Sequence, residues 1–218
     1  RVSMKAPKAA AIAGIIFSVL FMISLGLFLT STPANLREGG AWLSTQGDTI
    51  LLALNLVPFA GIAFLWFMGV VRDRLGDSED RFLSTVFFGS GLLFLAMLFS
   101  LAAVTGAVIL LYNPQANRLL AFGYYDFGRT IAREILNTYM LKMAGVFMIS
   151  TSTLFIRTRT IPRWMAFLGY GLAAIMLLRI QHLDRLGWIS LAFPLWVLLI
   201  SVYMLVDNYR QRPEGVSA

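Results

Sequence analysis

The polar side chains best placed to do chemistry lie in one long, mostly apolar segment of the chain. Glu134, Thr138 and Lys142 follow one another at intervals of four, so an α-helix puts them on one face. A carboxylate, a hydroxyl and an ammonium on one face can line a cavity, with Glu134 and Lys142 as a charge pair or a headgroup clamp. The alternative is structural: Lys142 leans toward the start of its helix and extends to the headgroups, while Glu134 neutralises it or a nearby arginine. The pattern leaves both interpretations open.

A second group of polar residues comprises Asp126, His182 and Asp184, which we expect at the outer surface of a membrane. A histidine beside an aspartate can form an acid–base pair or bind a metal, and the simpler interpretation is a solvated imidazole at the interface. The chain has one histidine and no cysteine. It therefore cannot by itself supply two axial histidines to a haem, a three-histidine zinc site or a thiolate ligand. We predict no metal site and no cofactor.

Asn55 stands three residues before Pro58 in another apolar segment. Proline has no N–H, so it leaves a carbonyl one turn back without its donor and kinks the helix. Asn55 can hydrogen-bond to that turn or to a neighbouring helix, and transporters also build midplane sites from kinked helices with polar groups. We therefore include Asn55 among the candidate ligand-binding residues.

Gly89-Ser90-Gly91 is similar to the serine motif of six-helix intramembrane proteases, but its position argues against that chemistry. Ser90 falls near the inner end of a predicted span and His182 near the outer surface, about 30 Å away. The glycines instead predict close helix contacts. Gly14 and Gly169, which also have small residues four positions away, predict the same.

Composition decides which elements must position these residues. Hydrophobic residues make up 58 % of the 218-residue chain and charged residues 13 %, against about 45–50 % and about 25 % in soluble domains. Mean hydropathy is +0.75. This composition excludes a disordered chain, a disulfide-stapled secreted domain and a soluble enzyme. The net charge of +7 sits at the ends of apolar runs, as in membrane proteins, so we expect no nucleic-acid partner.

A membrane-spanning helix needs about 20 mostly apolar residues, and the chain contains six such runs. Since lipid offers the backbone no hydrogen bonds, these runs should all be helical. We predict an all-α, polytopic helix bundle, with residues 1–218 forming a single integral membrane domain. The six transmembrane helices are expected at about residues 9–30, 49–71, 83–111, 131–156, 164–180 and 186–206.

The distribution of basic residues predicts the orientation of the bundle. With the N-terminus in the cytoplasm, eleven Lys and Arg lie in inside segments and six outside, with Lys142 within a span, which together account for all 18. This bias places both termini in the cytoplasm. The outside segments 31–48 and 112–130 are too apolar for free loops, so we expect them to lie on the outer membrane interface. They can do so as short amphipathic helices or as an aromatic belt that anchors the protein.

Two short motifs carry a resemblance to known proteins. Arg159-Thr-Ile-Pro162-Arg163-Trp164 precedes the fifth predicted helix, and Phe193-Pro194-Leu-Trp196 lies in the sixth. With these motifs the chain resembles small six-helix bacterial integral membrane proteins of unknown function. The resemblance implies a location in the bacterial plasma (inner) membrane. It supplies no catalytic residues.

The sequence therefore predicts a non-catalytic membrane protein, an accessory or scaffolding subunit whose partners are membrane lipids and other membrane subunits. The alternative is a small transporter or a lipid- or small-molecule-binding protein. Its polar cavity would lie between the second and fourth spans, lined by Asn55, Glu134, Thr138 and Lys142. A third interpretation is a lipid-modifying enzyme that uses Asp126, His182 and Asp184 at the outer surface.

Overall fold

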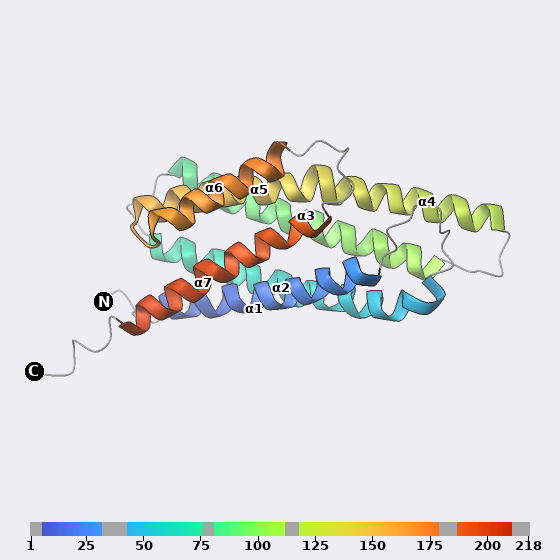
Figure 1. Ribbon diagram of the computed structural model, residues 1–218, viewed down its shortest axis with the longest axis horizontal. Coiled ribbons are helices and arrows are strands. Elements are labelled where there is room, and N and C mark those ends of the chain that lie inside the picture. Colours follow the sequence, from blue (N-terminus) through green and yellow to red (C-terminus); the bar gives the residue numbers. More distant parts are fainter. Residues whose placement is uncertain (1–5, 32–42, 76–80, 112–117, 179–186, 211–218) are drawn as a thin grey trace, which may run out of the picture.

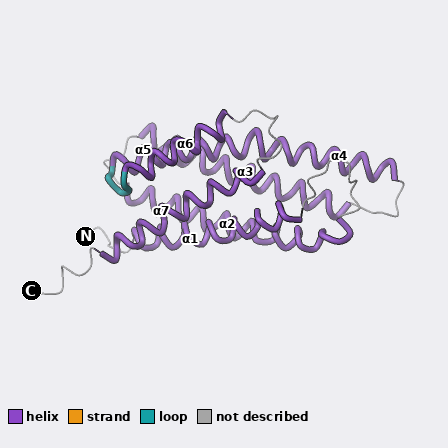
Figure 2. The backbone as a smooth tube through the Cα atoms, in the orientation of Figure 1, coloured by secondary structure: helices purple, strands orange, loops and turns teal. Residues whose placement is uncertain are grey.

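A computed structural model describes residues 6–31, 43–75, 81–111, 118–178 and 187–210 of the chain. These parts are helical throughout, apart from a short connection between two helices (Figure 2), and they contain no strand. The elements are α1 (Ala6–Ser31), α2 (Leu43–Leu75), α3 (Arg81–Leu111), α4 (Arg118–Glu134), the π-helical turn η3 (Ile135–Met140), α5 (Leu141–Arg157), α6 (Arg163–Leu178), the 3-10 turn η4 (Gly187–Leu191) and α7 (Ala192–Arg210).

Five of these helical stretches are long and apolar enough to cross a membrane. They are Lys8–Thr30, Thr45–Arg72, Arg81–Leu111, Gly123–Arg157 and Ile189–Arg210. The remaining helix, α6, has 16 residues, about 24 Å at 1.5 Å per residue, against a hydrocarbon core of about 30 Å. The all-helical fold class is thus confirmed, and the fifth predicted span is the short one, as its apolar run indicated.

The helices run up and down the bundle in sequence, so that α1 begins and α7 ends at the same end (Figure 1). At that end the Lys8 ammonium lies over the ring of Tyr209, 5.4 Å from its centroid. Helix α1 packs against α2 and α7, α3 packs against α2 and along α4, η3 and α5, and α6 packs mainly against α5. The described helices therefore make six passes along one bundle.

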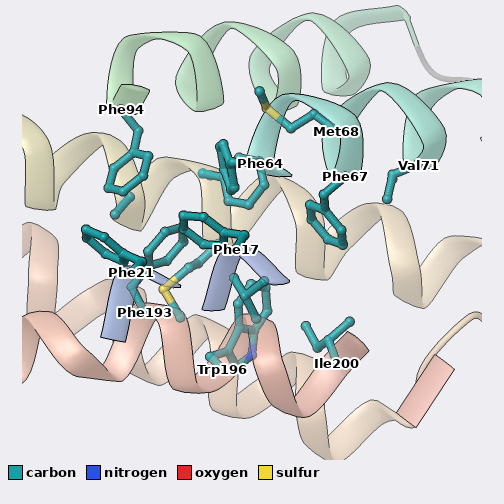
Figure 3. Packing of buried hydrophobic residues seen from close by; sticks show 14 of the residues in the cluster. Phe17, Phe21, Phe64, Phe67, Met68, Val71, Phe94, Phe193, Trp196 and Ile200 are labelled. Carbon is teal, nitrogen blue, oxygen red and sulfur yellow. The ribbon is translucent and has the colours of Figure 1, made fainter. Parts of the chain in front are cut away.

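Phenylalanines from five helices fill the centre of the bundle. Phe17 (α1), Phe64 (α2), Phe94 (α3), Phe147 (α5) and Phe193 (α7) are all buried. Ring centroids are 4.6 Å apart for Phe17–Phe64, 5.0 Å for Phe64–Phe147 and 4.8 Å for Phe94–Phe193. Figure 3 shows Phe17, Phe64, Phe94 and Phe193 converging. Tilted aromatic pairs of this kind stabilise a fold by more than the burial of their surface area alone. The cluster therefore stabilises the packing of five helices against one another.

Glycines set the closest approaches between helices, as the small-residue spacing predicted. A Cβ atom at Gly14 of α1 would collide with the Ser201 hydroxyl of α7, and one at Gly169 of α6 would collide with the Ser152 hydroxyl of α5. A Cβ atom at Gly91 would likewise collide with the sulfur of Met68, whereas a Cβ atom at Gly89 would have no neighbour within 4 Å. The close-contact interpretation of the Gly-Ser-Gly motif is therefore confirmed for its second glycine and wrong for its first.

A tight turn joins α5 to α6. Arg159 has a φ of 52°, its N–H donates to the Ile156 carbonyl at 3.2 Å, and the Thr160 N–H donates to the Phe155 carbonyl at 3.0 Å. This pair of bonds around a left-handed residue is the Schellman pattern that ends many helices. It folds α6 back against α5.

The region before the fourth span differs from its prediction. Residues from 118 onward do not form a separate interfacial helix; they continue without a break into η3 and α5. Helix α4 extends past the described ends of α2 and α3 (Figure 1). The reason is tertiary: Tyr125 is buried, and a Cβ at Gly128 would collide with Val108. The apolar stripe of α4 packs on α3 instead of on lipid.

Candidate polar site on the outer half of the fourth helical pass

A π-helical turn interrupts the long helix where its polar residues are concentrated. Across η3 the backbone changes register, and the N–H of Leu141 donates to the carbonyl of Leu136, five residues back. Such turns are rare, and those inside α-helices are frequently found at functional sites. This one lies between Glu134 and Lys142, the two charged members of the predicted polar face.

Glu134 and Thr138 are brought together as their spacing predicted. The Thr138 hydroxyl donates a hydrogen bond to Glu134 Oε2 over 2.9 Å. Glu134 is exposed and Thr138 is half-buried. The hydroxyl thus helps to satisfy a carboxylate that would otherwise be costly near a membrane.

Lys142 is half-buried on α5, one turn beyond this pair. Within the described parts of the chain its ammonium has neither an ion-pair nor a hydrogen-bond partner. The predicted charge pair with Glu134 is therefore not formed among these residues. The physical reason is the intervening π-turn, which takes more residues per turn than an α-helix and so rotates Lys142 away from its α-helical position relative to Glu134.

The depth of these residues follows from the bundle itself. Lys8, Arg72 and Arg157 end three apolar runs near the end where α1 begins. The phenylalanine cluster is about 12–15 Å from them at 1.5 Å per residue, about half a hydrocarbon core. In a bilayer centred on this cluster, Lys142 is about 7 Å outward of Phe147, within the hydrocarbon. Glu134 is near the outer boundary.

The structure places Asn55 apart from the other candidates. Asn55 is exposed on α2, which runs unbroken through Pro58. The polar contact near this proline comes from α1, where the Ser24 hydroxyl donates to the Ala53 carbonyl over 2.7 Å. Sequence reasoning missed Ser24, whose signal was a lone hydroxyl in an apolar helix. An exposed Asn55 fits a groove open to its surroundings better than an enclosed cavity.

The predicted outer cluster is described only in part. Asp126 is exposed on α4, whereas His182 and Asp184 lie outside the described residues. Over residues that are described, no group of three or more histidine, aspartate or glutamate side chains is placed to hold a metal ion. The cluster therefore stays a prediction.

Other polar contacts in the bundle hold helices together. The hydroxyls of Thr153 and Tyr170 are 2.8 Å apart between α5 and α6, and Trp196 Nε1 donates to the Met165 carbonyl between α7 and α6 over 3.2 Å. Ser150 and Thr151 donate to carbonyls of their own helix. These contacts of α5 are thus structural, and the candidate polar residues Glu134, Thr138 and Lys142 lie at the end of α4, in η3 and in the first turn of α5.

Comparison with known proteins adds no relative. No family model matches this chain, and no curated protein or solved structure matches it either.

Proposed function

We propose that the chain is a six-span membrane protein of the bacterial plasma membrane, with both termini in the cytoplasm, and that it acts as a non-catalytic accessory or scaffolding subunit. The five long apolar helices and the antiparallel return of α6 support the six spans. Lys8, Arg72 and Arg157 at one end support the orientation, because basic residues accumulate on the cytoplasmic side.

The exposed aromatic face of α4 is the observation that carries the scaffold proposal. Tyr125 and Gly128 pack inward, while Tyr124 and Phe127 are 64 % and 68 % exposed. Phe127 is about 30 Å outward of Phe147 along the helix, beyond the hydrocarbon of a bilayer centred on the phenylalanine cluster. Exposed aromatics that lipid does not cover are typical of protein–protein contacts. The occupant we propose is the outer part of a partner membrane protein.

The filled centre of the bundle supports the same role. Contacts among Phe64, Phe94, Phe147 and Phe193 close the space between α2, α3, α5 and α7. A substrate path along the bundle axis would have to move several of these buried rings. A rigid bundle that presents surfaces to partners needs no such movement.

A second candidate function is binding of a lipid or small molecule on the outer half of the fourth pass. The observation that favours it is Lys142, which lies at hydrocarbon depth without a partner among the described residues. Ionisable residues in such positions are expensive and are usually retained for function.

The scaffold proposal is tested by gentle purification of the full chain in lipid nanodiscs. We expect a defined complex with a second membrane protein, and we expect Tyr124→Ala with Phe127→Ala to weaken it at least tenfold. Phe59→Ala is the matched control, because Phe59 is equally exposed, at 62 %, but lies on α2 within the hydrocarbon. A chain that runs only as a monomer, or a complex equally weakened by both changes, contradicts the proposal.

A further inference from the structure

We propose that Lys142 binds the anionic headgroup of a membrane lipid. The starting point is a charge for which the described residues provide no counter-charge. Lys142 is half-buried, and none of the described side chains forms an ion pair or hydrogen bond with its ammonium. A charged lysine at hydrocarbon depth is energetically unfavourable. An anion that reaches it would remove much of that cost.

Near Lys142, helix α5 passes close to the last turn of α6. A Cβ at Gly145, three residues further along α5, would lie 3.1 Å from Leu177 Cγ and 3.3 Å from the Ala173 carbonyl, so α6 passes close there. The described part of α6 then ends at Leu178, which is 76 % exposed. Lys142 thus lies one turn from a close contact between α5 and α6.

Around Lys142 the helix face is apolar on one side and polar on the other, in the same order as the acyl chain and the headgroup of a lipid. Ile149, two turns toward the cluster and on the same face, is exposed and apolar. On the outer side lie Thr138 and Glu134, joined by their hydrogen bond, with the exposed ring of Tyr139 between them and Lys142. An acyl chain along Ile149 would place an anionic headgroup at Lys142, next to hydroxyl and carboxylate groups that can bind headgroup hydroxyls.

This order of apolar and polar residues favours a lipid headgroup as the anion at Lys142, rather than a carboxylate on the transmembrane helix of a partner protein. A partner helix would need a continuous packing surface on both sides of the lysine, whereas the residues outward of Lys142 are polar. The π-turn contributes by separating Lys142 from Glu134, which leaves the ammonium available for an outside anion. The inference rests on the second candidate function, binding of a lipid at this site, and does not depend on the scaffold role, which concerns Tyr124 and Phe127 of α4.

Native mass spectrometry of the full chain, released from detergent and titrated with lipid, tests the proposal. Phosphatidylglycerol is the anionic probe, phosphatidylcholine the zwitterionic one and inorganic phosphate the free anion. We expect one tightly bound phosphatidylglycerol, about tenfold weaker binding after Lys142→Met, and binding within about threefold of the original after Lys142→Arg. Lys8→Met is the matched control, since Lys8 lies at the opposite end over Tyr209, and it should change nothing at this site.

Three outcomes overturn the proposal. They are equal phosphatidylglycerol binding by the Lys142→Met protein, inorganic phosphate binding at Lys142 without lipid binding, and a partner protein whose capture needs Lys142 while lipid does not bind. Misfolding does not confuse the result, because Lys142→Met removes no hydrogen bond or ion pair with the described residues and keeps an unbranched apolar stem in the half-buried position. Its thermal unfolding in lipid-free detergent should occur at the same or a higher temperature than that of the original chain.

Discussion

Ser201 of α7 and Gly14 of α1 touch so closely that the serine hydroxyl occupies the space a Cβ at Gly14 would need. The hydroxyl is fully buried and has no hydrogen-bond partner among the described residues. It lies instead against the glycine backbone, where a weak Cα–H···O contact is possible. In lipid, where apolar burial does not drive helices together, such close backbone approach is a main source of helix association.

Gly14→Ala should therefore destabilise the bundle by about 1–3 kcal/mol through overpacking of the α1–α7 contact. The added methyl group cannot avoid Ser201 by moving aside, because Phe67 Cδ2 also lies 3.0 Å from the Cβ position. Unfolding in mixed detergent micelles measures the change. Gly26→Ala is the control, because nothing lies within 4 Å of a Cβ there, and it should be neutral or stabilising. Adding Ser201→Ala to Gly14→Ala should restore part of the loss, and an absence of coupling would contradict the contact.

The orientation of the bundle predicts which residues a membrane-impermeant maleimide can reach. The chain has no cysteine, so single cysteines can be introduced without a background. Asp126 on α4 and Thr158 in the α5–α6 turn are both exposed and lie toward opposite ends of the fourth pass. Asp126→Cys should be labelled in intact cells and Thr158→Cys only after permeabilisation, because Thr158 adjoins the basic end. Labelling of both from one side would exclude a spanning fourth pass, and the reverse pattern would invert the proposed sidedness.

The long apolar helices were predictable because their length and composition fit a membrane span, where lipid would impose a helix. A stretch that must satisfy its backbone in lipid becomes a helix whatever its neighbours do, and the first span, expected over 9–30, is observed as the apolar stretch Lys8–Thr30. The segment before the fourth span was not predictable in this way. Its amphipathic pattern fits an interfacial helix as well as a helix packed on protein, and only the contact of Gly128 with Val108 decides between them.

The candidate site was predicted in composition but not in geometry. The interval of four correctly joined Glu134 to Thr138. The interval of four did not predict the π-turn over Ile135–Met140. That turn packs on α3, a tertiary contact that the local sequence does not reveal. The same turn separates Lys142 from Glu134. Sequence spacing therefore predicted the contact of Glu134 with Thr138, whereas the charge pair of Glu134 with Lys142, one of the alternatives it left open, is not formed among the described residues.

The hydrogen bond between Thr153 and Tyr170 should make a modest contribution to the α5–α6 contact. Tyr170→Phe should destabilise the bundle by about 0.6 kcal/mol and no more than about 1.7 kcal/mol, the range measured for bonds between membrane helices. Thr153→Val should cost a similar amount, and the double variant should cost less than the sum, since the two hydroxyls bond to each other at 2.8 Å. Free energies of unfolding in mixed micelles for the original chain, the two single variants and the double variant complete the double-mutant cycle. Strict additivity would show that the two hydroxyls do not interact in the membrane.

Arg159 occupies a backbone conformation that favours glycine, so Arg159→Gly should stabilise the α5–α6 turn. A left-handed φ of 52° costs a residue with a Cβ about 1–2 kcal/mol, and the greater freedom of glycine when unfolded offsets about 0.5–1 kcal/mol of the gain. The net effect should be a stabilisation of up to about 1 kcal/mol, seen as a later unfolding transition in mixed micelles. Arg157→Gly is the matched control, because it removes the same charge from the last turn of α5 and should cost about 1 kcal/mol. Destabilisation by both changes would mean that the arginine side chain, and not the backbone of the Schellman turn, stabilises this end of the bundle.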